Sequence, residues 1–194
     1  MKYPLDSANS LLQELKRTGL SAPQWMLERE SFISGKTVPE IESAIEDRIK
    51  ATRESLNQGL ISRRKSFSGM SGADAAKLYD ALSKPGSIQD LPVGALFEKC
   101  VLYALAINEV NACGGKIVAF PTAGSCGIIP GVLHACHDSV VLPPVRFRES
   151  FIVASLIGAL IAAKIPLAGA AGGCQAECGA AGSMAAAGLV WCFH

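Results

Sequence analysis

Residues 148–164 have the sequence RESFIVASLIGALIAAK, which contains the most hydrophobic charge-free run of the chain. The run Phe151–Ala163 within it carries no charged side chain and no continuous polar face. An apolar pattern of this kind is typical of a helix that is buried on all sides. A membrane span needs about 20 apolar residues, so a run that Lys164 interrupts is too short to cross a bilayer. The sequence therefore predicts a central buried helix over 148–164 and no membrane segment.

Charged side chains are concentrated in the first half of the chain. Residues 1–99 hold 27 of them and residues 100–194 hold 8, whereas the second half has 12 of the 19 glycines. The first half is typical of solvated helices, and the second of helices whose backbones approach closely. The apolar content of 49% and the net charge of +1 exclude a disordered tail and argue against a nucleic-acid binder.

The seven cysteines are too dilute for a disulfide scaffold. Polar residues follow Met1 within a few positions, which does not fit a signal peptide. We therefore expect free or metal-bound thiols in a reducing, cytoplasmic compartment.

Local signals predict an all-α chain. One helix is expected from residue 7 to a stop at Gly19, and another after the capping box at Ser21–Gln24. A third is expected from the capping box at Thr37–Glu40 to a stop at Gly59. Two more are expected, from the cap at Ser71–Asp74 to a stop at Pro85–Gly86 and from Asp90 near Pro92 to Gly114. Residues 117–120 are expected to be a short extended crossing, and further helices to follow Gly127, to cover 148–164 and to run from Cys174 onward after a loop at 169–173. We predict one α-helical domain over 1–194, with charged N-terminal helices in 1–66.

The stretch Lys116–Gly127 combines an extended run with a Pro-Thr-Ala-Gly-Ser loop and a helix start. Backbone N–H groups and the hydroxyls of Thr122 and Ser125 would form a cradle for an anion or carboxylate at the positive end of a helix dipole. The same residue types are also ordinary caps and turns. The spacing is not that of a nucleotide-phosphate loop.

The second unusual stretch is Gly172–Gly179. A cysteine at a glycine-rich helix start, such as Cys174, can become a thiolate ligand, and Glu177 is the only acidic residue after position 150. Cys178 is interpreted as a small buried apolar side chain. A zinc site formed by His134, Cys136 and His137 with these cysteines is the competing interpretation, but the spacing lacks a four-ligand knuckle.

These stretches resemble the α chain of the iron–sulfur-dependent L-serine dehydratases. The resemblance is carried by four motifs, Gly69–Leu78 (GMSGADAAKL), Asn108–Ala112 (NEVNA), Lys116–Pro130 (KIVAFPTAGSCGIIP) and Gly173–Leu189 (GCQAECGAAGSMAAAGL).

The resemblance implies the all-α fold of that family and a lyase that converts L-serine to pyruvate and ammonia. It also implies a [4Fe–4S] cluster whose open iron acts as a Lewis acid on the leaving hydroxyl. Carried over by motif, Cys174 is one cluster ligand, and the substrate-binding loop is Thr122, Ala123, Gly124 and Ser125. The resemblance also implies that residues 67–194 are the N-terminal part of the catalytic core that binds the cluster and the substrate. A separate β chain is the implied partner.

The family's other two ligating cysteines are expected about 40 to 55 residues beyond Cys174, which is past residue 194. We therefore expect a truncated form of the α chain, inactive alone. The alternative is a non-catalytic helical subunit that docks through its apolar second half.

Overall fold

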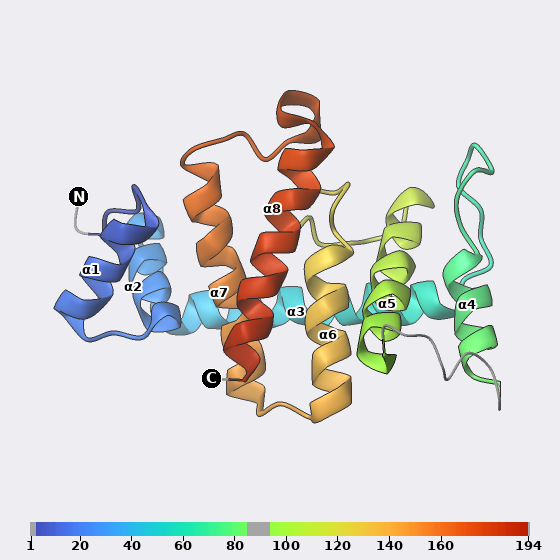
Figure 1. Cartoon of the computed structure of the whole chain (residues 1–194), viewed down its shortest axis with the longest axis horizontal. Helices are drawn as coiled ribbons and strands as arrows, with labels where there is room; N and C mark the ends of the chain where they lie inside the picture. The colour runs from blue at the N-terminus through green and yellow to red at the C-terminus, as the bar shows by residue number, and fades with distance from the viewer. Residues whose placement is uncertain (1–2, 85–93, 194) are drawn as a thin grey trace. The chain divides into compact units, whose positions relative to one another are not determined.

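The computed structural model describes residues 3–84 and 94–193, and it confirms the all-α fold class. Eight helices make up the described part of the chain (Figure 1): α1 (Ala8–Thr18), α2 (Ala22–Ser34), α3 (Val38–Ile61), α4 (Asp74–Leu82), α5 (Ala95–Ala112), α6 (Ile128–Val140), α7 (Pro144–Ala162) and α8 (Gly169–Cys192). None of the helices in the described ranges is long and apolar enough to cross a membrane.

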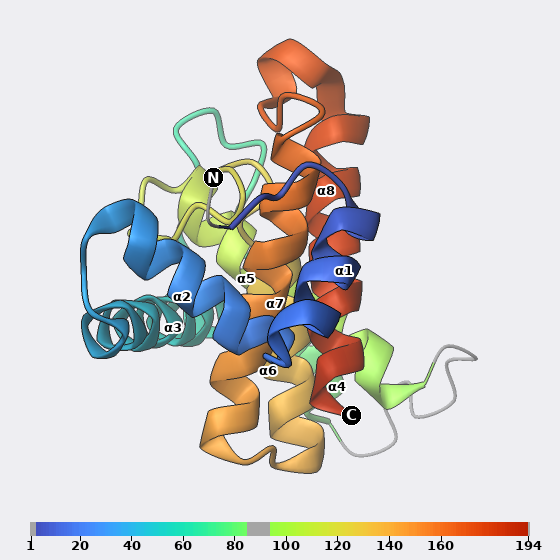
Figure 2. The same cartoon turned by 90° about the vertical axis from the view of Figure 1, so that its left-hand side faces the viewer.

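Two compact units divide the chain. One comprises residues 1–48 and 143–194, and the other residues 49–142. The boundary falls inside α3, which Figure 2 shows nearly end-on as one unbroken helix. The single domain over 1–194 stays a prediction.

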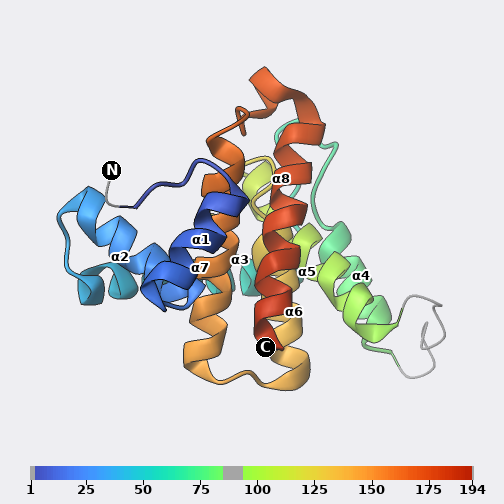
Figure 3. The same cartoon turned by 60° about the vertical axis from the view of Figure 1, so that its left-hand side comes forward.

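The first unit has its core where the N-terminal helices meet α7. Trp25 is fully buried in a cluster with Tyr3, Leu11 and Leu156, and the Tyr3 ring meets the Trp25 indole edge-on. α7 and α8 lie side by side and antiparallel (Figure 3). The predicted buried helix over 148–164 is confirmed as α7, which begins a few residues earlier at Pro144.

The second unit is built around α5, which packs against α4 and α6. Leu56, Ala106, Ile107 and Cys126 are buried in its core. The backbone of α3 comes close to α5 at Gly59, where a Cβ would lie 2.1 Å from the Ala106 carbonyl oxygen.

The predicted helix starts and stops are confirmed where the hydrogen-bonding partner lies close in sequence. The boxes at Ser21–Gln24 and Thr37–Glu40 form as predicted, Gly19 ends α1 with φ 69°, and residues 117–120 cross without helix.

Three local predictions are wrong. α3 continues through Gly59 to Ile61, because the glycine serves close packing there. Ser71 does not cap α4, which begins after Ala73 without a side-chain cap from its own N-cap residue. The loop expected at 169–173 is helical over Gly169–Gly172, with a kink at Gly173. The predicted signals at 85–86 and 90–92 lie outside the described residues.

Candidate functional site

The predicted substrate loop connects the extended crossing to α6. The Phe120–Pro121 peptide bond is cis. The Thr122 and Ser125 hydroxyl oxygens lie 2.8 Å apart, and the Ser125 N–H donates to Thr122 Oγ1 at 3.3 Å. The Cys126 N–H points back to the Ala123 carbonyl oxygen at 3.4 Å, and the Ile128 N–H to that of Ser125 at 3.1 Å. The loop is thus a tight turn that leads directly into α6.

The exposed part of this loop is backbone. Ala123 and Gly124 are exposed, whereas Ser125 is fully buried. The Ser125 hydroxyl is therefore turned inward against Thr122, and the 123–124 backbone is what the loop presents to solvent.

Two asparagines of α5 hold the loop and the start of α6. The Asn111 side-chain amide donates to the Ala123 carbonyl at 2.8 Å. Asn108 Oδ1 lies 3.4 Å from the Cys126 sulfur, and a Cβ at Gly127 would lie 3.1 Å from Asn108 Cγ. The sequence reasoning missed both roles. The available signal was their three-residue spacing, which places both on one helix face.

Glu109 of α5 fixes the segment that precedes α4. Its side chain is only 4% exposed, and its two oxygens accept from the backbone N–H groups of Asp74 at 2.9 Å and Ala75 at 3.2 Å. A buried carboxylate at a helix N-terminus satisfies donors that have no intrahelical partner and complements the helix dipole. Glu109 is therefore a structural group whose oxygens are both engaged.

Cys174 follows directly on the kink in α8. Gly173 has φ 74° and ψ 174°, a conformation that is essentially restricted to glycine. The Cys174 thiol is exposed and free, and its sulfur lies 3.6 Å from that of Cys178. The hydrogen bond with Cys174 and partial burial raise the pKa of the Cys178 thiol.

An iron–sulfur cluster needs several thiolate ligands. Cys174, an exposed thiol at the start of a long helical segment, suits one such position. Within residues 3–84 and 94–193, no three Cys, His, Asp or Glu side chains come together to hold a metal ion. The described residues therefore provide one thiol that fits a cluster ligand, Cys174, and not a complete ligand set. They also do not bring together the zinc ligands of the competing interpretation.

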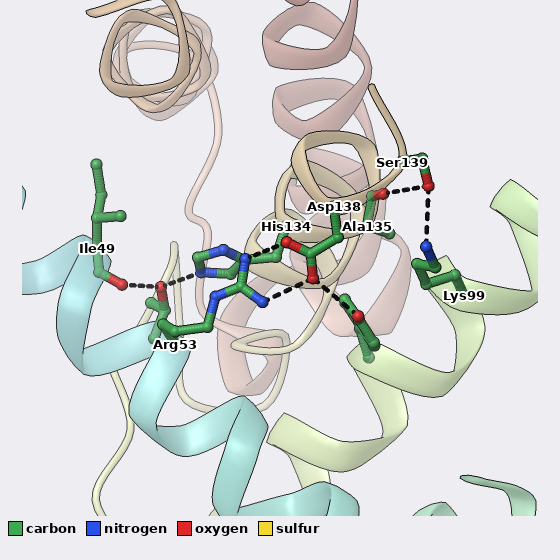
Figure 4. Close-up of polar contacts among 9 residues, drawn as sticks. Ile49, Arg53, Lys99, His134, Ala135, Asp138 and Ser139 are labelled. Atoms are coloured by element: carbon green, nitrogen blue, oxygen red, sulfur yellow. Dashed lines mark hydrogen bonds and ion pairs between the residues drawn. The ribbon is translucent and has the colours of Figure 1, made fainter. Parts of the chain in front are cut away.

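A polar network joins α3, α5 and α6 away from the loop (Figure 4). Arg53 forms a two-point ion pair with Asp138, which also accepts from the Tyr103 hydroxyl at 2.8 Å. The His134 Nε2 atom lies 2.9 Å from the Thr52 hydroxyl, deep in the unit. Burial, assisted by the Arg53 charge, lowers the pKa of His134 to about 3. Burial and the bond to Asp138 raise the pKa of Tyr103 to about 12. These shifts describe a neutral histidine locked in a structural network.

Comparison with known proteins decides the family. The family described as "Serine dehydratase alpha chain" matches residues 17–194. The chain belongs to this family.

Relatives in the serine dehydratase family cover almost all of the chain. It is 34% identical to the L-serine dehydratase alpha chain of Peptoniphilus asaccharolyticus, over 96% of this chain and 62% of that protein. It is 36% identical to L-serine dehydratase 2 of Escherichia coli and 35% identical to L-serine dehydratase of Haemophilus influenzae, in each case over 96% of this chain and 41% of the relative. The chain thus spans between two fifths and two thirds of the length of these relatives.

Proposed function

We propose that the chain acts as the α chain of an L-serine dehydratase, which eliminates water from L-serine and releases pyruvate and ammonia. The observation that carries this proposal is the match to the serine dehydratase alpha chain family over residues 17–194. An exposed thiol at position 174 and an exposed loop backbone at 123–124 support it.

The reaction removes the α-proton and the β-hydroxyl of L-serine as one water molecule. The resulting 2-aminoacrylate then takes up water and yields pyruvate and ammonia, so atoms balance without an oxidant or reductant. When bound, a [4Fe–4S] cluster supplies a Lewis acid for the departing hydroxyl. Cys174 would hold one iron of the cluster.

The substrate loop would bind the carboxylate of L-serine. Backbone N–H groups that precede a helix suit an anion, because they add hydrogen bonds to the positive end of the helix dipole. In this chain the exposed backbone of Ala123 and Gly124 lies one turn before α6. Residues 122–125 would therefore bind and orient the substrate.

The partner in this proposal is a serine dehydratase β chain, since relatives such as that of Peptoniphilus asaccharolyticus are named as alpha chains. The compartment is the cytoplasm, because all seven cysteines are free thiols, as a reducing environment maintains them.

The test uses the complete dehydratase containing this chain, reconstituted anaerobically with iron and sulfide. We expect pyruvate from L-serine, and loss of both iron and activity on Cys174→Ala. Cys178→Ala, four residues further along α8, is the matched control and should retain iron. A Cys174→Ala protein with a full complement of iron would overturn the ligand assignment. A wild-type protein that binds iron but forms no pyruvate would favour the docking subunit.

A further inference from the structure

The orientation of one peptide group in the substrate loop depends on α5. Ala123 and Gly124 form the exposed tip of the loop, and Asn111 reaches this tip by donating its amide to the Ala123 carbonyl at 2.8 Å. Asn111 lies near the end of α5 and is itself partly buried. The hydrogen bond therefore joins an exposed turn to a fixed helix.

The direction of the Ala123 carbonyl sets the direction of the Gly124 N–H. The carbonyl and the N–H of a trans peptide point in opposite directions. Since Asn111 draws the Ala123 oxygen toward α5, the Gly124 N–H points away from that helix. This N–H has no hydrogen-bond partner within the described ranges of the chain, and Gly124 is exposed. It is a donor available to a ligand.

We propose that Asn111 is a positioning residue that holds the Ala123–Gly124 peptide so that the Gly124 N–H faces the carboxylate of the substrate. This inference rests on the proposed serine dehydratase function. Asn111 acts through the peptide and does not itself touch the substrate. Loss of its amide leaves the Ala123 oxygen with only the longer bond from the Cys126 N–H at 3.4 Å, so the donor is held less firmly for the carboxylate.

The first test compares Asn111→Ala with Asn111→Asp in the complete dehydratase. Aspartate has nearly the same size, but its carboxylate only accepts hydrogen bonds and so repels the Ala123 oxygen. We expect both variants to raise KM for L-serine at least ten-fold and to change kcat less than three-fold, as for loss of an interaction made equally in ground and transition states. Asn57→Ala on the exposed surface of α3 is the matched control and should leave both constants unchanged.

A second variant removes the donor itself. Gly124 occupies the second position of a turn that the Cys126 N–H closes onto the Ala123 carbonyl, and proline is favoured at that position of both type I and type II turns. Gly124→Pro therefore suits the turn while deleting the N–H. We expect it to raise KM for L-serine at least ten-fold, without a further increase when Asn111→Asp is added.

The outcomes separate the inference from the function on which it rests. If the wild-type dehydratase forms no pyruvate from L-serine, the proposed function fails. If the wild type is active and Asn111→Asp keeps its KM, the positioning role is wrong. If Asn111→Asp keeps the normal KM and only Asn111→Ala raises it, the Asn111 side chain fills space and does not position the peptide. This result also overturns the inference. Additive effects of Asn111→Asp and Gly124→Pro would contradict action through this peptide.

Discussion

At the level of single residues, Glu109 is the group on which the start of α4 depends. Its oxygens accept from two backbone N–H groups at a buried position. Removal of the carboxylate leaves these donors without their partner, and hydrogen bonds to charged groups contribute about 1.5–3 kcal/mol.

We expect Glu109→Ala to lower the free energy of unfolding by about 2 to 3 kcal/mol, measured by urea denaturation. Glu109→Gln retains one acceptor oxygen and should cost less. Glu54→Ala on the exposed side of α3 is the control and should have little effect. Equal stability of Glu109→Ala and wild type would refute the capping role.

His134 makes the stability of the protein depend on pH. The folded chain keeps this imidazole neutral down to about pH 3, whereas an unfolded histidine binds a proton near its ordinary value of 6.5. The stability contributed by neutral His134 is therefore complete above about pH 6.5 and is lost as the pH falls toward 3. The slope for one such group approaches about 1.4 kcal/mol per pH unit.

We expect the free energy of unfolding of wild type to fall more steeply between pH 6.5 and 4.5 than that of His134→Gln, which stays neutral throughout. Urea denaturation at four pH values measures both curves. The variant is less stable at pH 7.5, and the difference should narrow as the solution is acidified. Parallel curves would show that His134 does not remain neutral in the folded state.

The candidate site could be predicted only in part from its residues. Cys174 and the 122–125 loop were found because each belongs to a contiguous motif. The contacts of Asn111 with Ala123 and of Glu109 with Asp74 join segments that are separate in sequence. No local pattern states which backbone group a distant side chain will meet, so these two roles required the structure.

At the level of elements, replacing a helical glycine by alanine is expected to change stability in opposite directions in α3 and α8. In α3, a Cβ at Gly59 would overlap the Ala106 backbone, whereas at Gly182 in α8 nothing lies within 4 Å. Alanine favours a helix by about 1 kcal/mol over glycine, but forced overpacking costs about 1–3 kcal/mol and more where backbone cannot move.

We expect Gly59→Ala to destabilise the protein by at least about 2 kcal/mol and Gly182→Ala to stabilise it by about 0.5–1 kcal/mol. Thermal unfolding of both variants checks the signs. A stabilising Gly59→Ala would mean that α3 and α5 do not approach as closely as their glycine contact requires.

The difference between local and tertiary contacts explains which helix boundaries could be predicted from the sequence. The boxes at Ser21–Gln24 and Thr37–Glu40 were predicted correctly because donor and acceptor lie three residues apart. Gly59 and Ser71 were misinterpreted because packing against α5 and the Glu109 carboxylate outweigh local preference. Element type followed from periodicity, and at Gly59 and Ser71 tertiary contacts override the local signal.

At the level of the whole molecule, the first unit is assembled from two separate segments of the chain, residues 1–48 and 143–194. Arg148 on α7 contacts the carboxylates of Glu42 at 2.9 Å and Glu46 at 2.6 Å on α3. The two contacts join residues more than one hundred positions apart, and the Arg148 side chain is only 22% exposed. They connect the charged N-terminal helices to the apolar C-terminal half.

We expect Arg148→Ala to lower the free energy of unfolding by about 1 kcal/mol, as for a partly exposed ion pair. The loss should shrink in 0.5 M salt, where charges are screened. Arg17→Ala breaks an exposed pair within α1 and should have a smaller effect. If salt does not change the loss of unfolding free energy in Arg148→Ala, the side chain stabilises through packing of its aliphatic part and not through its charge.

The first unit, which residues 49–142 interrupt in sequence, also determines the order in which the chain can fold on the ribosome. Residues 49–142 are contiguous, so all parts of the second unit have been synthesised before Pro143 is added. Trp25 packs with Leu156, so α1 and α2 must wait for α7 before their apolar side chains are covered. Helices α1 and α2 are therefore synthesised before residues 49–142 but belong to the unit that is completed after them, so their apolar side chains stay uncovered until α7 has been made.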